Sequence, residues 1–192
     1  MGRIVVTEFI SLDGVIEDPG GAESFEHGGW TFAFDTGEEG GGFKLQETLD
    51  AEALLLGRVT YDGFAAAWPT MEGTGEFGEK MNGMPKYVVS STLGEPEWSN
   101  STVLRGDVAE EVAKFKREID GVILVAGSAQ LAQTLLELDL VDEIRLMLFP
   151  VVLGSGKRLF GATSEKKPMR LVDSKSVGDG VTILTYERAP VS

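Results

Sequence analysis

The stretch ALLLGRVTYDGFAAAWP, residues 53–69, predicts a strand that passes directly into a helix. Residues 53–56 are apolar without interruption, which is typical of a strand buried on both faces of a sheet. Gly57 then turns the chain, and we expect a helix from Val59 to Ala67 that stops at Pro69. The sequence therefore places a glycine, an arginine and a threonine at the carboxyl end of a buried strand.

The composition limits the class of protein. A chain of 192 residues, 42% of them hydrophobic, can form one sizeable core, and none of its apolar stretches approaches the roughly 20 residues of a membrane-spanning helix. A net charge of −14 disfavours nucleic acids and anionic membranes as partners, because both bind basic surfaces. The chain contains no cysteine, which excludes disulfides and thiolate metal sites, and we predict no metal site. We expect a cytoplasmic enzyme with a small-molecule substrate.

Strands and helices are expected to alternate along most of the chain. Strands are predicted at residues 3–10, 52–56, 86–90, 102–104, 122–126, 143–153, 169–177 and 181–187, and helices at 43–49, 59–67, 109–118 and 129–138. This alternation indicates a mainly parallel sheet with crossover helices. The last two strands are joined at Gly178-Asp179-Gly180, which predicts an antiparallel hairpin. The glycine-rich stretch 19–42 contains several aromatic residues and is expected to be a long loop that covers a site.

Small and hydroxyl residues follow three predicted strands at their carboxyl ends. They are Gly57, Arg58 and Thr60 in the first case, Ser90 and Ser91 in the second, and Gly127, Ser128, Ala129 and Gln130 in the third. In open α/β sheets, ligands bind at these strand ends, and the N-terminus of a following helix favours phosphate. Each residue alone also fits an ordinary turn or helix cap. The coincidence of three such ends favours a phosphate-bearing ligand.

Five segments, in this order, resemble the dihydrofolate-reductase-like superfamily, and within it the group of the C-terminal reductase domain of bacterial riboflavin biosynthesis. They are SLDGVIE, LLLGRVTYDGFAAAWP, KYVVSSTL, ILVAGSAQLAQTLLE and VDEIRLMLFPVVLGSGKRLF. The resemblance covers essentially the whole chain. It implies one α/β domain over residues 1–190, with a mixed, mainly parallel sheet flanked by helices and a C-terminal antiparallel hairpin.

The resemblance also implies NADPH as the cofactor. Gly57, Arg58 and Thr60 match the segment that meets the adenosine side and its 2′-phosphate, and Ser90 and Ser91 match the next strand end on that side. Gly127, Ser128, Ala129 and Gln130 match the loop and helix start that hold the pyrophosphate.

Asp13 matches the turn beside the nicotinamide and is the predicted catalytic carboxylate, although an Asx-type turn with Gly14 would equally explain it. Phe9, Ile16 and Trp30 are expected to line the nicotinamide and substrate pocket.

The expected function is an NADPH-dependent reductase that transfers hydride to a C=O or C=N carbon of a small pyrimidine- or pteridine-like substrate, as the 5-amino-6-(5-phosphoribosylamino)uracil reductase does. Two alternatives are a folate-type reductase and a nucleotide-binding module without turnover. Folate reductases carry a carboxylate on the helix before the second strand. Here Glu38 and Glu39 come too early for that position and Glu47 too late, which counts against folate reduction.

A homodimer is also expected. Residues 144–153, IRLMLFPVVL, are apolar or proline except for Arg145, and no helix is predicted after Leu138 to cover this strand. A second copy of the chain would provide matching apolar surface.

Overall fold

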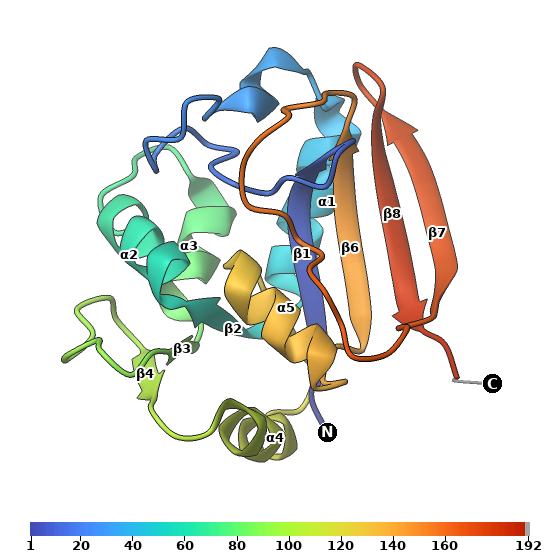
Figure 1. The fold of residues 1–192 in the computed structure, drawn as a ribbon. Coiled ribbons are helices and arrows are strands. Elements are labelled where there is room, and N and C mark those ends of the chain that lie inside the picture. The colour runs from blue at the N-terminus through green and yellow to red at the C-terminus, as the bar shows by residue number, and fades with distance from the viewer. Residues whose placement is uncertain (191–192) are drawn as a thin grey trace.

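The computed structural model describes residues 1–190, which form a single α/β domain around one eight-stranded sheet (Figure 1). The strands are β1 (Arg3–Ser11), β2 (Ala51–Gly57), β3 (Lys86–Val89), β4 (Ser101–Leu104), β5 (Val122–Val125), β6 (Glu143–Phe149), β7 (Met169–Val177) and β8 (Val181–Arg188). The helices are the 3-10 helix η1 (Trp30–Ala33), α1 (Gly37–Leu49), α2 (Arg58–Ala67), α3 (Gly75–Gly83), α4 (Val108–Glu118) and α5 (Ala129–Glu137). None of these helices is long and apolar enough to cross a membrane.

The strand order β4-β3-β2-β5-β1-β6-β8-β7 combines a parallel part with an antiparallel edge. All pairings from β4 to β6 are parallel, whereas β8 runs antiparallel to both β6 and β7. The predicted mixed sheet with a C-terminal antiparallel hairpin is therefore confirmed.

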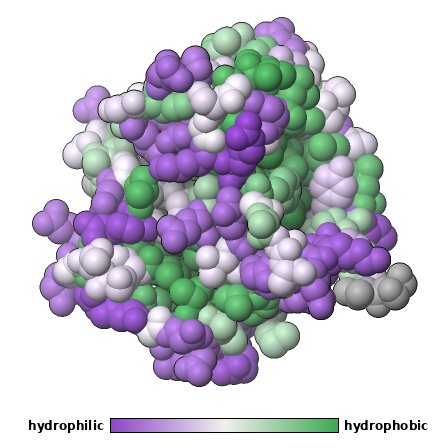
Figure 2. Space-filling model, in the orientation of Figure 1, coloured by the Kyte–Doolittle hydropathy of each residue, from purple (hydrophilic) through white to green (hydrophobic). Residues whose placement is uncertain are grey.

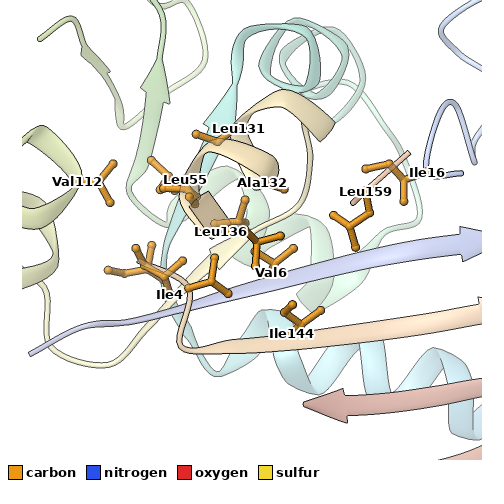
Figure 3. Packing of buried hydrophobic residues seen from close by; sticks show 14 of the residues in the cluster. Ile4, Val6, Ile16, Leu55, Val112, Leu131, Ala132, Leu136, Ile144 and Leu159 are labelled. Carbon is orange, nitrogen blue, oxygen red and sulfur yellow. The ribbon is translucent and has the colours of Figure 1, made fainter. Parts of the chain in front are cut away.

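Helices cover the two faces of the sheet. Alternate residues of β1 point to opposite faces: Ile4 and Val6 pack with α4 and α5, whereas Val5 packs with α2 and α3. Figure 3 shows Leu136 of α5 beside Val6, and Leu131 of the same helix beside Leu55 of β2. Figure 1 shows α1 on the opposite side of β1 from α5. On the outer side of α4 and α5, polar side chains cover much of the surface (Figure 2).

The predictions missed two helices, η1 and α3, and about half of a third, α1. α1 begins at Gly37 rather than at Phe43, so part of the expected loop 19–42 is helical. Its first half, GEEGGG, has poor intrinsic helix propensity. Glu38 and Glu39 in the first turn favour a helix start electrostatically, and α3, which was not predicted, packs against α1. Tertiary packing therefore supports helices that the local sequence disfavours.

The expectation of a strand through residues 143–153 is wrong in its second half. β6 ends at Phe149, because Pro150 cannot donate to the ladder. It lies between β1 and β8, and both of its faces are covered by this chain: Ile144 packs with α5, and Phe149 packs with Trp30. The argument that a partner must cover this strand is therefore wrong.

The edge strand β7 is the more open part of the sheet. Leu171 and Val172 are 49% and 47% exposed. The homodimer stays a prediction.

One charged side chain lies inside the core at the start of β3. Lys86 is fully buried, and its Nζ donates to the carbonyl oxygens of Asn82, Met84 and Ser99 at 2.9, 2.9 and 3.0 Å. The same ammonium group lies 4.3 Å from the centre of the Trp98 ring. Lys86 thereby joins the C-terminal end of α3 to the segment before β4.

Replacing Lys86 by Met should lower the free energy of unfolding by about 2–4 kcal/mol, because three buried carbonyl groups lose their donor. Urea denaturation measures this loss. The matched control is Lys114→Met on the exposed side of α4, which should change stability by less than about 0.5 kcal/mol. An equally small effect at both positions would contradict the structural role of Lys86.

Candidate active site

The sheet opens between β1 and β5 at their carboxyl ends. β5 pairs with β1 only as far as Val125, which lies opposite Val6, whereas β1 continues to Ser11. From Thr7 onward, the edge of β1 that faces β5 therefore has no strand beside it. The helices that follow β1 and β5 lie on opposite faces of the sheet, which makes this gap a topological switch point, where ligands bind in open α/β sheets.

A cavity of about 510 Å³, here called the inner cavity, occupies this opening. Most of its wall is apolar, with the side chains of Phe9, Ile16, Leu54, Phe64, Trp68, Phe77, Met81 and Leu124. Its polar lining includes Thr7 and Glu8 of β1, Lys44 and Glu47 of α1, and Glu23 of the loop before η1. The shape and lining suit a flat ring that hydrogen-bonds at one edge.

A second cavity of about 400 Å³, here called the outer cavity, shares Val59, Ser128 and Gln130 with the inner one. Its polar side chains include Arg58, Ser90, Ser91, Thr92 and Arg105, and no carboxylate lines it. In a chain with a net charge of −14, such a lining is selective for an anionic group.

The two strand-to-helix turns that follow β2 and β5 pack directly against each other. A Cβ atom on Gly57 would lie 2.2 Å from Ser128 Oγ, and one on Gly127 would lie 2.6 Å from Thr60 Oγ1. Gly127 also has a φ of +85°, which favours glycine. Both glycines are thus needed for contact between the turns.

Arg58 is held at the outer cavity by its own helix. Its Nε donates to both carboxylate oxygens of Asp62 at 2.9 and 2.8 Å, and its Nη1 lies 3.5 Å from Thr92 Oγ1. Asp62 engages the Nε side of the guanidinium, while the Nη1 side lies at the hydroxyl-bearing turn. Ser90 Oγ accepts hydrogen bonds from the backbone N–H groups of Thr92 and Leu93 and shapes that turn.

The start of α5 borders both cavities. Ser128 is its N-cap, and the Ser128 hydroxyl accepts a hydrogen bond from Leu131 N at 3.5 Å. The first N–H groups of a helix have no partner within the helix. Ala129 and Gln130 belong to this first turn and line the inner cavity. This end of α5 can therefore bind an anion between the two cavities.

Glu8 is the most perturbed acid of the inner cavity. Only 9% of the residue is exposed, and its Oε1 atom is buried with no hydrogen-bond partner. Burial raises the pKa of Glu8 to about 8, although Lys44 and the backbone N–H of Gly127 oppose that rise. Glu8 is therefore protonated at neutral pH and able to donate a proton.

A second carboxylate is held in a polar network beside it. Glu47 Oε1 accepts a hydrogen bond from Thr7 Oγ1 at 2.8 Å and pairs with the Lys44 ammonium group. Lys44 Nζ also donates to Thr7 Oγ1 at 2.9 Å and lies 4.9 Å from the centre of the Phe9 ring. The second Glu47 oxygen, Oε2, is buried without a hydrogen bond.

Asp13, the predicted catalytic carboxylate, lines neither cavity. Its carboxylate accepts hydrogen bonds from Ser11 Oγ at 2.6 Å and from the backbone N–H groups of Leu153 and Gly154 at 3.1 and 2.8 Å. The Ser11 hydroxyl and these two N–H groups lower the pKa of Asp13 to about 2. Asp13 therefore fastens the turn after β1 to the chain after β6, which differs from the local Asx-type turn with Gly14 considered as the alternative.

The three predicted pocket residues separate into two groups. Phe9 and Ile16 line the inner cavity. Trp30 does not, because its ring packs edge-on against Phe149 with the ring centres 5.5 Å apart, and its Nε1 donates to the Glu17 carbonyl. Its prediction as a pocket residue is wrong, since it belongs to the core on the β6 side.

The nine residues predicted to hold the cofactor are brought together along the two cavities. Gly57, Arg58, Ser90 and Ser91 line the outer cavity, Thr60, Gly127 and Ala129 line the inner one, and Ser128 and Gln130 line both. Sequence reasoning missed Glu8, Glu23, Lys44 and Arg105. The sequence did carry a signal for Glu8, which is an acid inside an otherwise largely apolar strand. Burying a carboxyl group in such a strand costs free energy, and this points to a functional role.

The fold and the two joined cavities define a dihydrofolate-reductase-like α/β domain. The chain belongs to the RibD C-terminal domain family, whose model matches residues 3–183. Two uncharacterized proteins of Bacillus subtilis are similar in sequence. YyaP is 31% identical over 138 residues, which cover 70% of this chain and 73% of YyaP. YwjB is 28% identical over 180 residues, which cover 94% of both chains.

Two solved structures share the fold. The crystal structure of a "putative riboflavin biosynthesis protein" from Shewanella sp. PV-4 matches with a TM-score of 0.76 and 23% identity, covering 98% of this chain and 99% of that one. A pyrimidine reductase-like protein from Corynebacterium diphtheriae matches with a TM-score of 0.64 and 12% identity, covering 98% and 92%. At these identities the likeness concerns the fold alone.

The raised pKa of Glu8 should make protein stability depend on pH. Between its ordinary value of 4.5 and its folded value of about 8, the unfolded chain releases the Glu8 proton while the folded protein retains it. Glu8 therefore favours the folded state most at low pH, and its contribution falls by up to about 1.4 kcal/mol per pH unit as the pH rises through this range.

Glu8→Gln removes this titration while keeping the shape of the side chain. The stability of the variant relative to the wild type should therefore increase from about pH 5 to about pH 8, as measured by urea denaturation at several pH values. Glu118→Gln at the exposed end of α4 is the control, and its difference from the wild type should stay constant. A constant difference for Glu8→Gln as well would show that Glu8 is ionised in the folded protein.

Proposed function

We propose that the protein is an NADPH-dependent reductase that transfers hydride to a C=O or C=N carbon of a small pyrimidine- or pteridine-like ring. The observation that carries this proposal is the pair of joined cavities at the strand ends, one basic and rich in hydroxyls, the other apolar with buried carboxylates. Membership of the RibD C-terminal family supports it, as do the two structural neighbours, one described as a riboflavin biosynthesis protein and the other as a pyrimidine reductase-like protein.

The outer cavity fits the adenosine end of the cofactor. Arg58 and Arg105 supply two guanidinium groups, and Ser91 and Thr92 supply hydroxyls, without any carboxylate in the lining. A 2′-phosphate is a dianion that such groups bind with charge-assisted hydrogen bonds. The N-terminal turn of α5, at the junction of the two cavities, would bind the pyrophosphate.

The inner cavity fits the nicotinamide and the substrate. Bound NADPH supplies a hydride, and the chain's own residues orient the acceptor and exclude water. The aromatic wall of Phe9, Phe64 and Trp68 provides flat contact area. The Glu47 Oε2 atom, buried without a hydrogen bond and 3.7 Å from Arg145 Nη1, would accept a hydrogen bond from an N–H group of the ring.

Glu47 also gives specific support to a second candidate, a folate-type reductase. It is a buried carboxylate on the helix before β2, and it lines the inner cavity. Sequence spacing alone had placed it too late on that helix. Tight binding of the antifolate methotrexate, weakened by Glu47→Gln, would favour this candidate over other pteridine- or pyrimidine-like substrates.

NADPH should bind more tightly than NADH, and Arg58→Ala or Arg105→Ala should remove most of this preference. Losing one charge-assisted phosphate contact should cost about 1.5–3 kcal/mol of NADPH binding, with little effect on NADH. Isothermal titration calorimetry measures both affinities. The control is Arg117→Ala on exposed α4, which should leave both affinities unchanged. Equal affinity of the wild type for the two cofactors would sink the assignment of the outer cavity.

A further inference from the structure

We propose that Glu8 is the proton donor of the reduction, delivering a proton from its carboxyl group to the heteroatom of the C=O or C=N bond whose carbon accepts hydride. This inference rests on the proposed function and deepens it, because it defines which acceptors the site can use. It gives the role first expected of Asp13 to a residue on the strand before that turn.

The position of Glu8 supports this role. It lies on β1 two residues beyond Val6, where pairing with β5 has ended, so its side chain lines the opening of the sheet. Phe9 and Ile16, the two residues expected at the nicotinamide, line the same cavity. Glu8 also faces the turn at Gly127, where both cavities meet α5. Its Oε1 atom is buried and has no hydrogen-bond partner among residues 1–190, so its hydrogen-bonding capacity is left for a ligand.

Burial, rather than the surrounding charges, keeps Glu8 neutral. From α1, the Lys44 ammonium favours the carboxylate form and Glu47 disfavours it. Glu23, from the loop before η1, also disfavours the charge, whereas the Gly127 N–H favours it. Burial outweighs these charges, and the pKa of Glu8 rises to about 8. Glu17 and Lys157, which also line the cavity, pair with each other at 3.5 Å.

Other titratable groups are less suited to donate the proton. Glu47 is engaged by Thr7 and Lys44, which favours its action as an acceptor. Asp13 lies outside the cavity and is ionised at neutral pH. His27 does not line the inner cavity, and its side chain is 44% exposed beside Glu26.

The chemistry balances in one step. The acceptor carbon gains a hydride from the reduced nicotinamide, the C=O or C=N π bond breaks, and its electron pair takes the proton from the Glu8 carboxyl group. NADP⁺ and an alcohol or amine are formed, and Glu8 is left as a carboxylate near Lys44. Water returns the proton before the next cycle. The substrate class is therefore a neutral carbonyl or imine, since an iminium cation needs no proton.

Two acceptors that differ in their need for a proton test the proposal. Reduction of 4-nitrobenzaldehyde needs a proton on oxygen, whereas the N-methyl-3,4-dihydroisoquinolinium cation accepts hydride alone. Glu8→Gln should lower kcat for the aldehyde by about 10²–10⁴-fold and change kcat for the cation little, with NADPH oxidation followed by absorbance. Wild-type kcat for the aldehyde should fall as the pH rises through about 8, whereas the rate with the cation should lack this step.

The control variant, Glu118→Gln, should behave as the wild type with both acceptors, and calorimetry should show that Glu8→Gln still binds NADPH. Equal losses with both acceptors would mean that Glu8 only maintains the cavity, and no loss with either would remove it from the reaction; both results overturn the inference and leave the reductase standing. A wild type that does not bind NADPH would instead overturn the proposed function.

An independent readout does not need turnover. Carbon-13 NMR of glutamate-labelled protein saturated with NADPH should show one carboxyl group, absent from Glu8→Gln, that is protonated at neutral pH. An ionised Glu8 at neutral pH would overturn the proposal whatever the acceptors show.

Discussion

The contact between two strand-to-helix turns organises the site. Gly57 lies against Ser128, and Gly127 lies against Thr60, with no space for a Cβ atom at either glycine. This contact fixes the starts of α2 and α5 side by side at the carboxyl ends of β2 and β5. Both cavities border these turns, one on the side of Arg58 and the other on the side of Glu8. A side chain at either glycine would move the turns apart and alter both cavities together.

Much of the fold could be predicted from the sequence because its central strands are buried on both faces. Runs such as residues 53–56 and 122–125 are apolar without interruption. They are too short for a helix, so the sequence predicts buried strands there. The glycine-rich start of α1 and the whole of α3 could not be predicted. Their stability comes from packing against each other and against the sheet, which local propensity does not report.

The candidate site was predictable where its residues belong to turns. Gly57 and Ser128 both come shortly after a predicted apolar strand, which can be read from the sequence, and both line the outer cavity. Arg105 and Glu8 belong to no such pattern: they reach the site only through the pairing of β3 with β4 and of β1 with β5. These pairings depend on the order of the strands in the sheet, and that order is known only once the complete fold is known.

Two carboxylates on and just after β1 show how the fold sets acid strength. Asp13 accepts three hydrogen bonds in an open turn, and its pKa falls to about 2. Glu8 has a buried oxygen without a hydrogen-bond donor in the inner cavity, and its pKa rises to about 8. Their ordinary values differ little, so the separation comes from donors and burial. The ionised residue is used to hold a turn in place, and the neutral one keeps its proton where an acceptor ring would bind. The proposed reduction of a neutral bond at neutral pH would need the second environment, which lies where β5 ends beside the longer β1.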